Sequence, residues 1–442
     1  MQKTTETAVA APPEPRRHLA LGTLLATGGQ VAPLVAAAGV SLAVARRYGP
    51  SGTGVMSLVM NLFDVTLMIF TLGLSSGVTY LVSRREWRLG RVARETRGAA
   101  IGLGALGAVC GLGFYLITRH SVFRGVPVRL ALISLGSLPF ALIWAFFAAA
   151  ALGRDRYEAY TVFEVIYSLV MLLAGVAAVI AFGLTGAISS FAAANVLTAG
   201  VAIAWMRRAR RAEVAAQGNE AGVGAAGGDR GAEGARSRPL ARAFRFGLQA
   251  WSANLLQLLN YRLDIFILGS VAARSSIGVY SIAVSVTGLG WVLPNAFQTV
   301  LFPRVASLHA DVGEGRITTH ESDSAAARAL RHATLLVLPT ALALVVVVLL
   351  VPLVYGARFE RSVALGFVLI PGVASLGIAK VASAVFSGRG FPRYAFYTTA
   401  ITVPATVALY VALIPPLHET GEVLASTISY FVTMTVSLSY LC

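Results

Sequence analysis

The sequence predicts an all-α polytopic membrane protein with about twelve transmembrane helices in two six-helix lobes. Three observations predict this fold class: 56% of the 442 residues are hydrophobic and only 13% are charged, long apolar runs recur along the chain, and the two halves share a sequence pattern. A transmembrane helix needs roughly 20 mostly apolar residues, so runs of this length indicate spans. A soluble multidomain protein would be far more polar.

The apolar runs define the expected elements. They cover residues 19–44, 55–82, 99–118, 128–152, 157–182, 184–206, 244–271, 277–302, 333–355, 363–386, 395–414 and 422–442. Between the sixth and seventh run lies a stretch rich in Arg, Ala, Gly and Glu, which cannot bury a core. We therefore expect a cytoplasmic tail at 1–18, an N-terminal lobe at 19–206, a disordered cytoplasmic linker at 207–243 and a C-terminal lobe at 244–442. Turns are expected at Gly49, Gly183 and Gly388.

An internal repeat relates the two halves. The segments Gly54–Leu58 and Gly278–Ile282 match, and the same offset aligns Asn61 with Ser285. Each half contains an even number of expected spans, which makes the repeats parallel, related by an axis along the membrane normal. Many secondary transporters are built from such repeats, so this pattern favours transport.

The formal net charge of +16 raises the question of a nucleic-acid partner, so the distribution of the basic residues matters. Most of them fall on alternate loops, including the cluster at 84–97 and the linker after Arg207. The positive-inside rule places this side in the cytoplasm, with both termini inside and short external loops. Topology explains the charge, and no nucleic-acid partner is expected.

Polar residues form stripes on three apolar helices. They recur at three- and four-residue spacing in the second, eighth and seventh spans: Ser57, Asn61, Asp64, Thr71 and Ser75; Ser281, Ser285, Asn295 and Thr299; Asn254, Gln257, Tyr261 and Asp264. Such stripes indicate either a shared water-accessible cavity or hydrogen bonds between packed helices. We favour packing for single Ser and Thr residues. For Asp64 and Asp264 we favour the cavity, because a charge inside a membrane needs a partner or water.

Two basic residues, Arg262 and Lys380, fall well inside expected spans, which makes them candidates for binding an anionic ligand. Arg262 and Asp264 are separated by about 200° around a helix, so they should point to nearly opposite sides. The alternative for both basic residues is snorkelling to an interface, or a structural pair with an acid such as Glu164.

Several segments resemble a known family. Ala45–Gly54 with Leu72–Gly77, then Asn260–Asp264, Gly278–Ser281 and Leu301–Arg304, are similar to the motifs of polysaccharide biosynthesis flippases. These form the O-antigen and oligosaccharide branch of the multidrug, oligosaccharidyl-lipid and polysaccharide exporter superfamily. The resemblance implies two lobes around a central cavity and alternating access. It further implies movement of an undecaprenyl-pyrophosphate-linked oligosaccharide across the cytoplasmic membrane, for cell-surface polysaccharide biosynthesis.

The resemblance and the polar stripes together give the expected site. Its expected substrate-binding residues are Arg262, Lys380, Asn254, Gln257, Asn61, Ser285 and Asn295. Arg262 lies in a family motif, whereas Lys380 is proposed from burial alone. Asp64, Asp264 and Glu164 are candidates for carrying a coupling ion. The expected partners are the lipid-linked substrate, membrane lipids and a polysaccharide polymerase, with no cofactor and no metal.

Other functions remain open from the sequence. On the same scaffold, a multidrug or cation antiporter would use acids rather than basic residues. A membrane glycan ligase or polymerase is disfavoured, because every expected external loop is short and no catalytic constellation is recognisable, so we expect no enzyme. Many family members have thirteenth and fourteenth spans, and both a twelve-span member and a shortened chain fit a sequence ending at Cys442.

Overall fold

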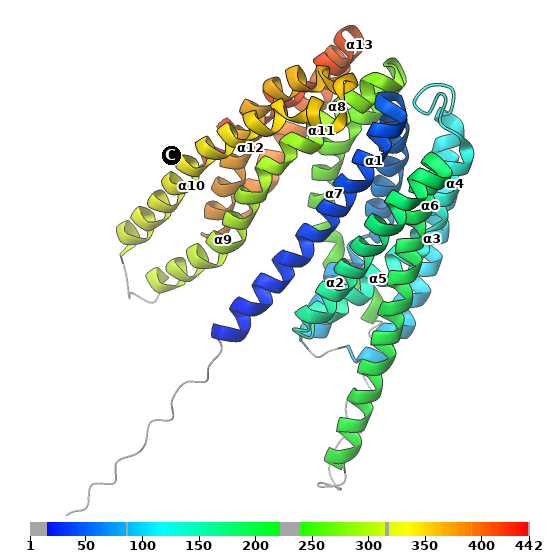
Figure 1. The fold of residues 1–442 in the computed structure, drawn as a ribbon. Helices are drawn as coiled ribbons and strands as arrows, with labels where there is room; N and C mark the ends of the chain where they lie inside the picture. Colours follow the sequence, from blue (N-terminus) through cyan, green and yellow to red (C-terminus); the bar gives the residue numbers. More distant parts are fainter. Residues whose placement is uncertain (1–15, 85–86, 222–238, 314–317, 390, 441–442) are drawn as a thin grey trace, which may run out of the picture.

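The computed structural model describes residues 16–84, 87–221, 239–313, 318–389 and 391–440, and these ranges contain helices and no strand (Figure 1). The N-terminal half contains α1 (Arg16–Thr71), α2 (Leu74–Ser83), α3 (Leu89–Thr118), α4 (Val128–Gly136), α5 (Leu138–Leu152) and α6 (Tyr157–Ala221). The C-terminal half contains α7 (Pro239–Val271), α8 (Arg274–Thr287), η1 (Gly288–Trp291), α9 (Val292–Gly313), α10 (Thr319–Leu349), α11 (Val351–Tyr355), η2 (Ala357–Phe359), α12 (Arg361–Gly388) and α13 (Pro392–Ser439).

Within the described residues, seven helices are long and apolar enough to cross a membrane. Three of these stretches, in α1, α6 and α13, run for 41, 59 and 44 residues, about twice the roughly 20 that one crossing needs. Each is interrupted by a residue with non-helical backbone angles: Gly49 in α1, Gly183 in α6 and His418 in α13. The turns expected at Gly49 and Gly183 are thus confirmed, as is the turn after Gly388, where α12 ends. The total of twelve spans stays a prediction.

The helices around the expected linker are longer than the composition indicated. Of the linker predicted at 207–243, residues 207–221 continue α6 and residues 239–243 begin α7. The physical reason is that Arg, Ala and Glu are strong helix formers even where they cannot bury a core. Residues 222–238 lie outside the described part of the chain.

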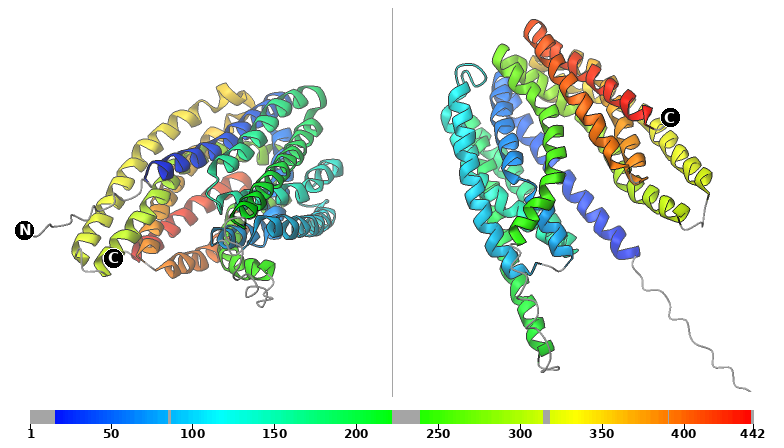
Figure 2. Two further views of the ribbon diagram at one scale, coloured as in Figure 1. Left: turned by 90° about the horizontal axis from the view of Figure 1, so that it is seen from below. Right: turned by 180° about the vertical axis from the view of Figure 1, so that it is seen from behind.

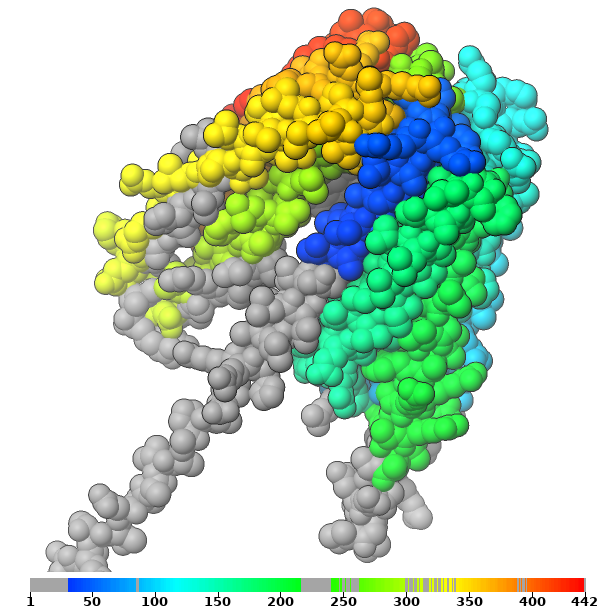
Figure 3. All heavy atoms as spheres, viewed as in Figure 1, coloured from blue at the N-terminus to red at the C-terminus, as the bar shows by residue number. Residues whose placement is uncertain are grey.

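The helices form two lobes that meet at one end and diverge at the other. One lobe contains α2 to α6 and the other contains α8 to α13, with α1 and α7 running between them (Figures 1 and 2). The C-terminal end of α6 and the α9 and α10 ends lie where the lobes diverge. The space-filling view shows the blue atoms of α1 in contact with the yellow and orange atoms of the C-terminal half at the upper end (Figure 3).

At the closed end, α1 and α8 touch through glycine. A Cβ built on Gly54 would lie 2.0 Å from the Arg274 carbonyl oxygen, and one on Gly278 would lie 1.9 Å from the Pro50 carbonyl oxygen. Only residues without a side chain allow two helix backbones to approach this closely. Arg46 of α1 adds a contact with α11, because its Nε and Nη2 donate to the carbonyl oxygens of Val354 and Leu353 at 2.7 and 3.0 Å.

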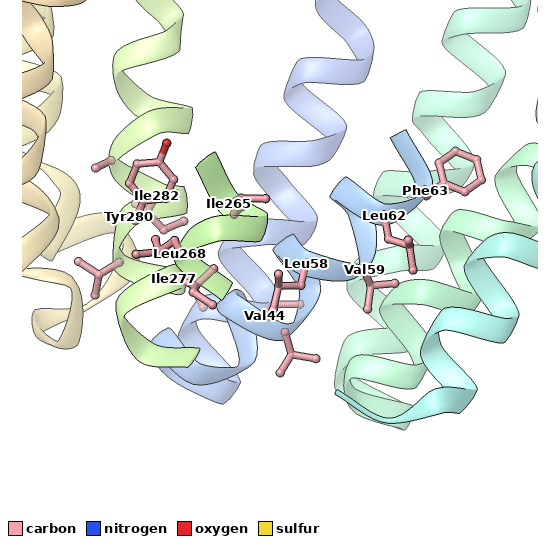
Figure 4. Packing of buried hydrophobic residues seen from close by; sticks show 14 of the residues in the cluster. Val44, Leu58, Val59, Leu62, Phe63, Ile265, Leu268, Ile277, Tyr280 and Ile282 are labelled. Atoms are coloured by element: carbon pink, nitrogen blue, oxygen red, sulfur yellow. The ribbon is translucent and has the colours of Figure 1, made fainter. Parts of the chain in front are cut away.

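The main apolar cluster spans both halves at this end. Val44 and Leu58 of α1 lie beside Leu268 of α7 and Ile277 of α8, and all four are buried (Figure 4). Burial of such side chains contributes about 1.5–3 kcal/mol each in water, although in a membrane the gain comes from packing rather than from leaving water. The cluster therefore holds the two lobes together above the space where they diverge.

Candidate functional site

A cavity of about 420 Å³ lies between α1, α7 and α8. Its lining includes the residues that the sequence repeat aligns, pair by pair: Met56 with Tyr280, Ser57 with Ser281, Met60 with Val284, and Asn61 with Ser285. Helices α1 and α8 therefore line the same cavity with residues that correspond to each other in the sequence repeat. Of the polar stripes predicted on the second and eighth spans, the first two residues of each lie here, and Asp64, Thr71, Ser75 and Asn295 are not in the lining. The side chain of Thr299 lies outside the described residues.

Arg262 of α7 reaches from the C-terminal half to α1. Its Nη1 donates to Oδ1 of Asn61 at 3.0 Å, and its Nη2 lies 3.1 Å from Oδ2 of Asp64. Asn61 is itself held by a hydrogen bond from its Nδ2 to the Ser57 carbonyl oxygen at 2.9 Å. The Arg262 and Asp64 side chains are 41% and 38% exposed, and Arg262 lines the cavity, so a ligand that enters the cavity can reach the guanidinium. The predicted structural pair of Arg262 with an acid is present, but its partner is Asp64 rather than Glu164.

Asp264 points away from this pair, as the rotation of about 200° predicted. It is 6% exposed, and its Oδ1 accepts the backbone N–H of Ile265 at 2.6 Å. The hydroxyl of Tyr280, on α8, donates to Oδ2. Asp264 and Tyr280 also contribute to the cavity lining, so this carboxyl lies at the wall between the cavity and the C-terminal lobe.

A second carboxyl, Glu422 of α13, lies against Asp264 and Tyr280. Glu422 is fully buried, and its Oε1 accepts a hydrogen bond from Ser426 Oγ at 2.6 Å. The hydroxyls of Tyr410 and Ser426 extend the network, 3.0 Å apart. In the sequence, Glu422 is only the first residue of the last expected span. The spacing of Glu422 and Ser426, one helical turn apart, was the available signal of a polar face.

Lys380 and Asn295, both expected in the site, lie together elsewhere in the C-terminal lobe. The Lys380 ammonium donates to Asn295 Oδ1 at 2.9 Å and lies 5.0 Å from the centroid of the Trp291 ring. Trp291 in turn packs edge-on against Tyr430, with ring centroids 6.0 Å apart. Neither Lys380 nor Asn295 lines the cavity around Arg262. A cation over an aromatic ring next to an amide forms a second polar site, separate from the first.

The remaining expected residues are not brought into this cavity. Glu164 of α6 is half-buried and interacts with the hydroxyl of Tyr160 on its own helix. It does not belong to the cavity lining. The side chains of Asn254 and Gln257 lie outside the described residues.

Comparisons with known proteins agree with the motif resemblance. Residues 233–364 match the family model of a polysaccharide biosynthesis protein. This segment contains Arg262, Asp264 and Asn295. No curated protein matches the chain.

Solved structures share the fold over nearly the whole chain. One is an inward-facing multidrug resistance MATE family transporter of the MOP superfamily, with a TM-score of 0.68 and 16% identity over 93% of both chains. Another is the lipid II flippase MurJ in an inward closed conformation, with a TM-score of 0.69 and 11% identity over 95% of this chain and 87% of the other. A third is a MOP superfamily transporter from Pyrococcus furiosus, with a TM-score of 0.64 and 16% identity over 97% of this chain and 95% of the other. The predicted resemblance is thereby confirmed: the chain is a multi-pass membrane protein that shares the fold of MOP superfamily transporters, and its residues 233–364 match the model of a polysaccharide biosynthesis protein.

Proposed function

We propose that the protein is a flippase that moves an undecaprenyl-pyrophosphate-linked oligosaccharide across the cytoplasmic membrane. The observation that carries the proposal is the cavity between the lobes, where Arg262 is accessible among amide and hydroxyl groups. The planar guanidinium donates in a fork that suits phosphate oxygens, and the neighbouring polar groups suit sugar hydroxyls. The match of residues 233–364 to a polysaccharide biosynthesis protein supports the same substrate class.

In this proposal the Arg262–Asp64 pair holds the site ready for an anion. Arg262 donates a hydrogen bond to Asn61 and forms an ion pair with Asp64. A pyrophosphate that enters the cavity replaces these two partners of the guanidinium. When the ligand replaces Asp64 as the partner of Arg262, the Asp64 carboxylate loses its ion pair. Because both side chains are partly exposed, this does not leave a buried charge unpaired. The ligand is therefore recognised by replacement of one carboxylate with another anion.

Alternating access would separate the lobes at the closed end and bring them together at the divergent end. The contact between Gly54 and Gly278 is the point that must open, and these residues align in the sequence repeat. The positive-inside rule places the divergent end in the cytoplasm, since the basic end of α6 lies there. The described arrangement is then the state that receives substrate from the inner leaflet.

The Asp264–Glu422 contact is the proposed coupling site. Two buried carboxyl groups in contact cannot both remain charged without a cation, so they share a proton or hold a metal cation. Loss of that proton or cation would change the energy of packing α7 against α13, which are the helices that carry the two acids. Asp64, with its cation partner, fits coupling less well, and Glu164 lies away from the cavity.

Deletion of the gene in its host tests the substrate class. The proposal expects a complete lipid-linked oligosaccharide to accumulate in the inner leaflet and the surface polysaccharide to disappear. Both effects should be reversed by the wild-type chain and not by Arg262→Ala expressed at the same level. Unchanged lipid-linked glycan and unchanged surface polysaccharide would contradict the proposal.

A multidrug or cation antiporter is the second candidate, because the carboxylate of Asp64 is partly exposed and lies beside the cavity residue Arg262. The shared fold with multidrug MATE transporters supports this candidate as well. Efflux of a cationic dye from vesicles that is abolished by Asp64→Asn would favour it. Dye efflux equal to that of vesicles without the protein would exclude the antiporter candidate.

A further inference from the structure

A second pocket, separate from the cavity between the lobes, lies at the end of the N-terminal lobe where the basic residues gather. It has a volume of about 200 Å³ and shares no lining residue with the central cavity. We call it the arginine pocket, defined by Arg94 and Arg97 of α3, Arg207 and Arg210 of α6, and Gly90, Ala93, Phe147, Ile203 and Met206. A Cβ on Gly90 would lie 3.4 Å from Cδ of Arg210, which shows that Arg210 extends across to α3.

The charges of this pocket are uncompensated in the described part of the chain. Its lining contains four arginines and no acidic residue. On each helix the two arginines are three residues apart, and therefore on one face. The nearby acids are used elsewhere: Glu95 pairs with Arg91 at 2.6 Å, and Glu213 pairs with Arg154. Like charges on facing helices repel, so a bound anion would stabilise the packing of α3 on α6.

The remaining lining is apolar. Phe147 and Met206 are each 2% exposed, and Ile203 and Ala93 are half-buried. The apolar run of α6 ends at Met206 and its basic run begins at Arg207. On α3 the order is reversed, with Arg97 followed by an apolar run from Ala99. The pocket therefore lies at the level where a membrane changes from headgroups to hydrocarbon.

The four arginines together with the apolar lining indicate the chemical class of the ligand. A soluble polyanion would use the arginines but leave the apolar lining unused, whereas an amphiphile uses both. Pockets that enclose drug-sized molecules measure about 300–1,000 Å³, so one of 200 Å³ holds only part of a larger molecule. Basic pockets between membrane helices on the cytoplasmic side bind anionic lipid headgroups by this chemistry.

We propose that the arginine pocket binds the phosphate headgroup of an anionic phospholipid. The phosphate lies among the four arginines, and the glycerol and first acyl carbons lie against the half-buried Ala93 and Ile203. The site does not depend on the proposed transport function, because it lies outside the cavity. Its effect is to tie α3 to α6 within the N-terminal lobe.

Native mass spectrometry of the full-length protein tests this proposal. Phosphatidylglycerol and phosphatidylcholine with identical acyl chains are titrated separately, because they differ in headgroup charge. Wild-type protein should bind one phosphatidylglycerol much more tightly than phosphatidylcholine. In Arg94→Gln/Arg207→Gln this affinity should fall by about tenfold or more, given the contribution of each basic residue near an anionic surface. The pair Arg97→Gln/Arg210→Gln repeats the test with different residues.

The matched control is Arg119→Gln/Arg129→Gln, which removes the same charge at the opposite end of α3 and at the start of α4. This variant should retain wild-type affinity. The melting temperature of each variant in lipid-free detergent shows whether it folds. Equal losses in the control and in both pocket variants would overturn the proposal. So would binding of glycerol 1-phosphate as tight as that of phosphatidylglycerol, since the pocket would then bind a soluble anion.

Discussion

Two aspartates lie in different surroundings around the same cavity: Asp264 lines it, and Asp64 pairs with the cavity residue Arg262. Asp64 is 38% exposed and has a guanidinium partner, Arg262, from the other half of the chain. Asp264 is 6% exposed, takes its hydrogen bonds from a phenol and a backbone N–H, and forms no ion pair with a described basic side chain. A second carboxyl, Glu422, lies against it. One acid is balanced by a fixed cation, whereas the other needs a mobile proton or cation.

The difference separates two tasks that one cavity must perform. A pair accessible to water exchanges partners at low cost, so the Asp64–Arg262 pair is suited to ligand recognition. A buried pair of acids changes energy strongly with its charge state, so Asp264 and Glu422 are suited to drive a conformational change. Substitutions on the two sides should therefore affect different measurements.

Arg262→Ala should have the largest effect, because it removes the cation of the paired site and leaves Asp64 to repel an anionic substrate. Charge-assisted hydrogen bonds contribute about 1.5–3 kcal/mol, so transport should fall by about tenfold or more. The measurement is the rate at which surface polysaccharide recovers when each variant is expressed in cells that lack the gene. Arg262→Lys is the control, since it keeps the charge and loses the fork, and it should retain part of the activity. Equal rates for wild type and Arg262→Ala would assign the pair a purely structural role.

Asp264→Asn should have the next largest effect, and on a different property. Asparagine preserves the shape and can still accept a hydrogen bond from Tyr280, but it cannot exchange a proton. Transport should fall several-fold and lose its dependence on pH or on the ion gradient, and Glu422→Gln should do the same. Substrate flipping is measured in proteoliposomes across a pH series and with sodium imposed on one side. If both variants keep the wild-type pH and sodium response, coupling resides elsewhere.

The sequence predicts the helices and one side of the cavity better than the buried acid pair. Apolar length and glycine turns are local properties, so the reversals at Gly49 and Gly183 could be located in advance. The helical period also identified Asn61 and Ser285 as cavity residues, because they lie on polar faces. The meeting of Asp264 with Glu422 joins helices far apart in the chain, and no local pattern encodes that contact.

The same limitation explains Glu164 and Lys380. Both are ionisable residues inside apolar runs, a position that indicates a membrane location but not which space the side chain faces. Glu164 interacts with Tyr160 one turn away, and Lys380 lies over Trp291. Neither borders the central cavity. A charged side chain inside a membrane can be stabilised by a polar or aromatic neighbour in the same lobe as well as by a water-filled cavity.

Asp64→Asn should have a smaller effect, in the opposite direction to Arg262→Ala for ligand binding. Removing the carboxylate frees Arg262 for an anionic ligand. Ion pairs this exposed contribute about 0.2–1 kcal/mol, so affinity should rise by no more than about fivefold. Binding of a lipid pyrophosphate is measured by native mass spectrometry or calorimetry. Weaker binding in Asp64→Asn would show that Asp64 positions Arg262 rather than competing with the ligand.

Tyr280→Phe should have the smallest effect, and it distinguishes the two acids most sharply. The substitution removes one hydrogen bond to Asp264 and leaves the buried ring in place, so the packing of α8 should be preserved. A single hydrogen bond contributes about 0.5–1.5 kcal/mol, which corresponds to a change of about two- to tenfold. The pH at which proteoliposome transport is half-maximal should shift, while the affinity for a lipid pyrophosphate should stay within about twofold of wild type, because Arg262 is untouched. If the affinity changed and the pH midpoint did not, the buried carboxyls would belong to ligand recognition, and the division between the two sites would fail.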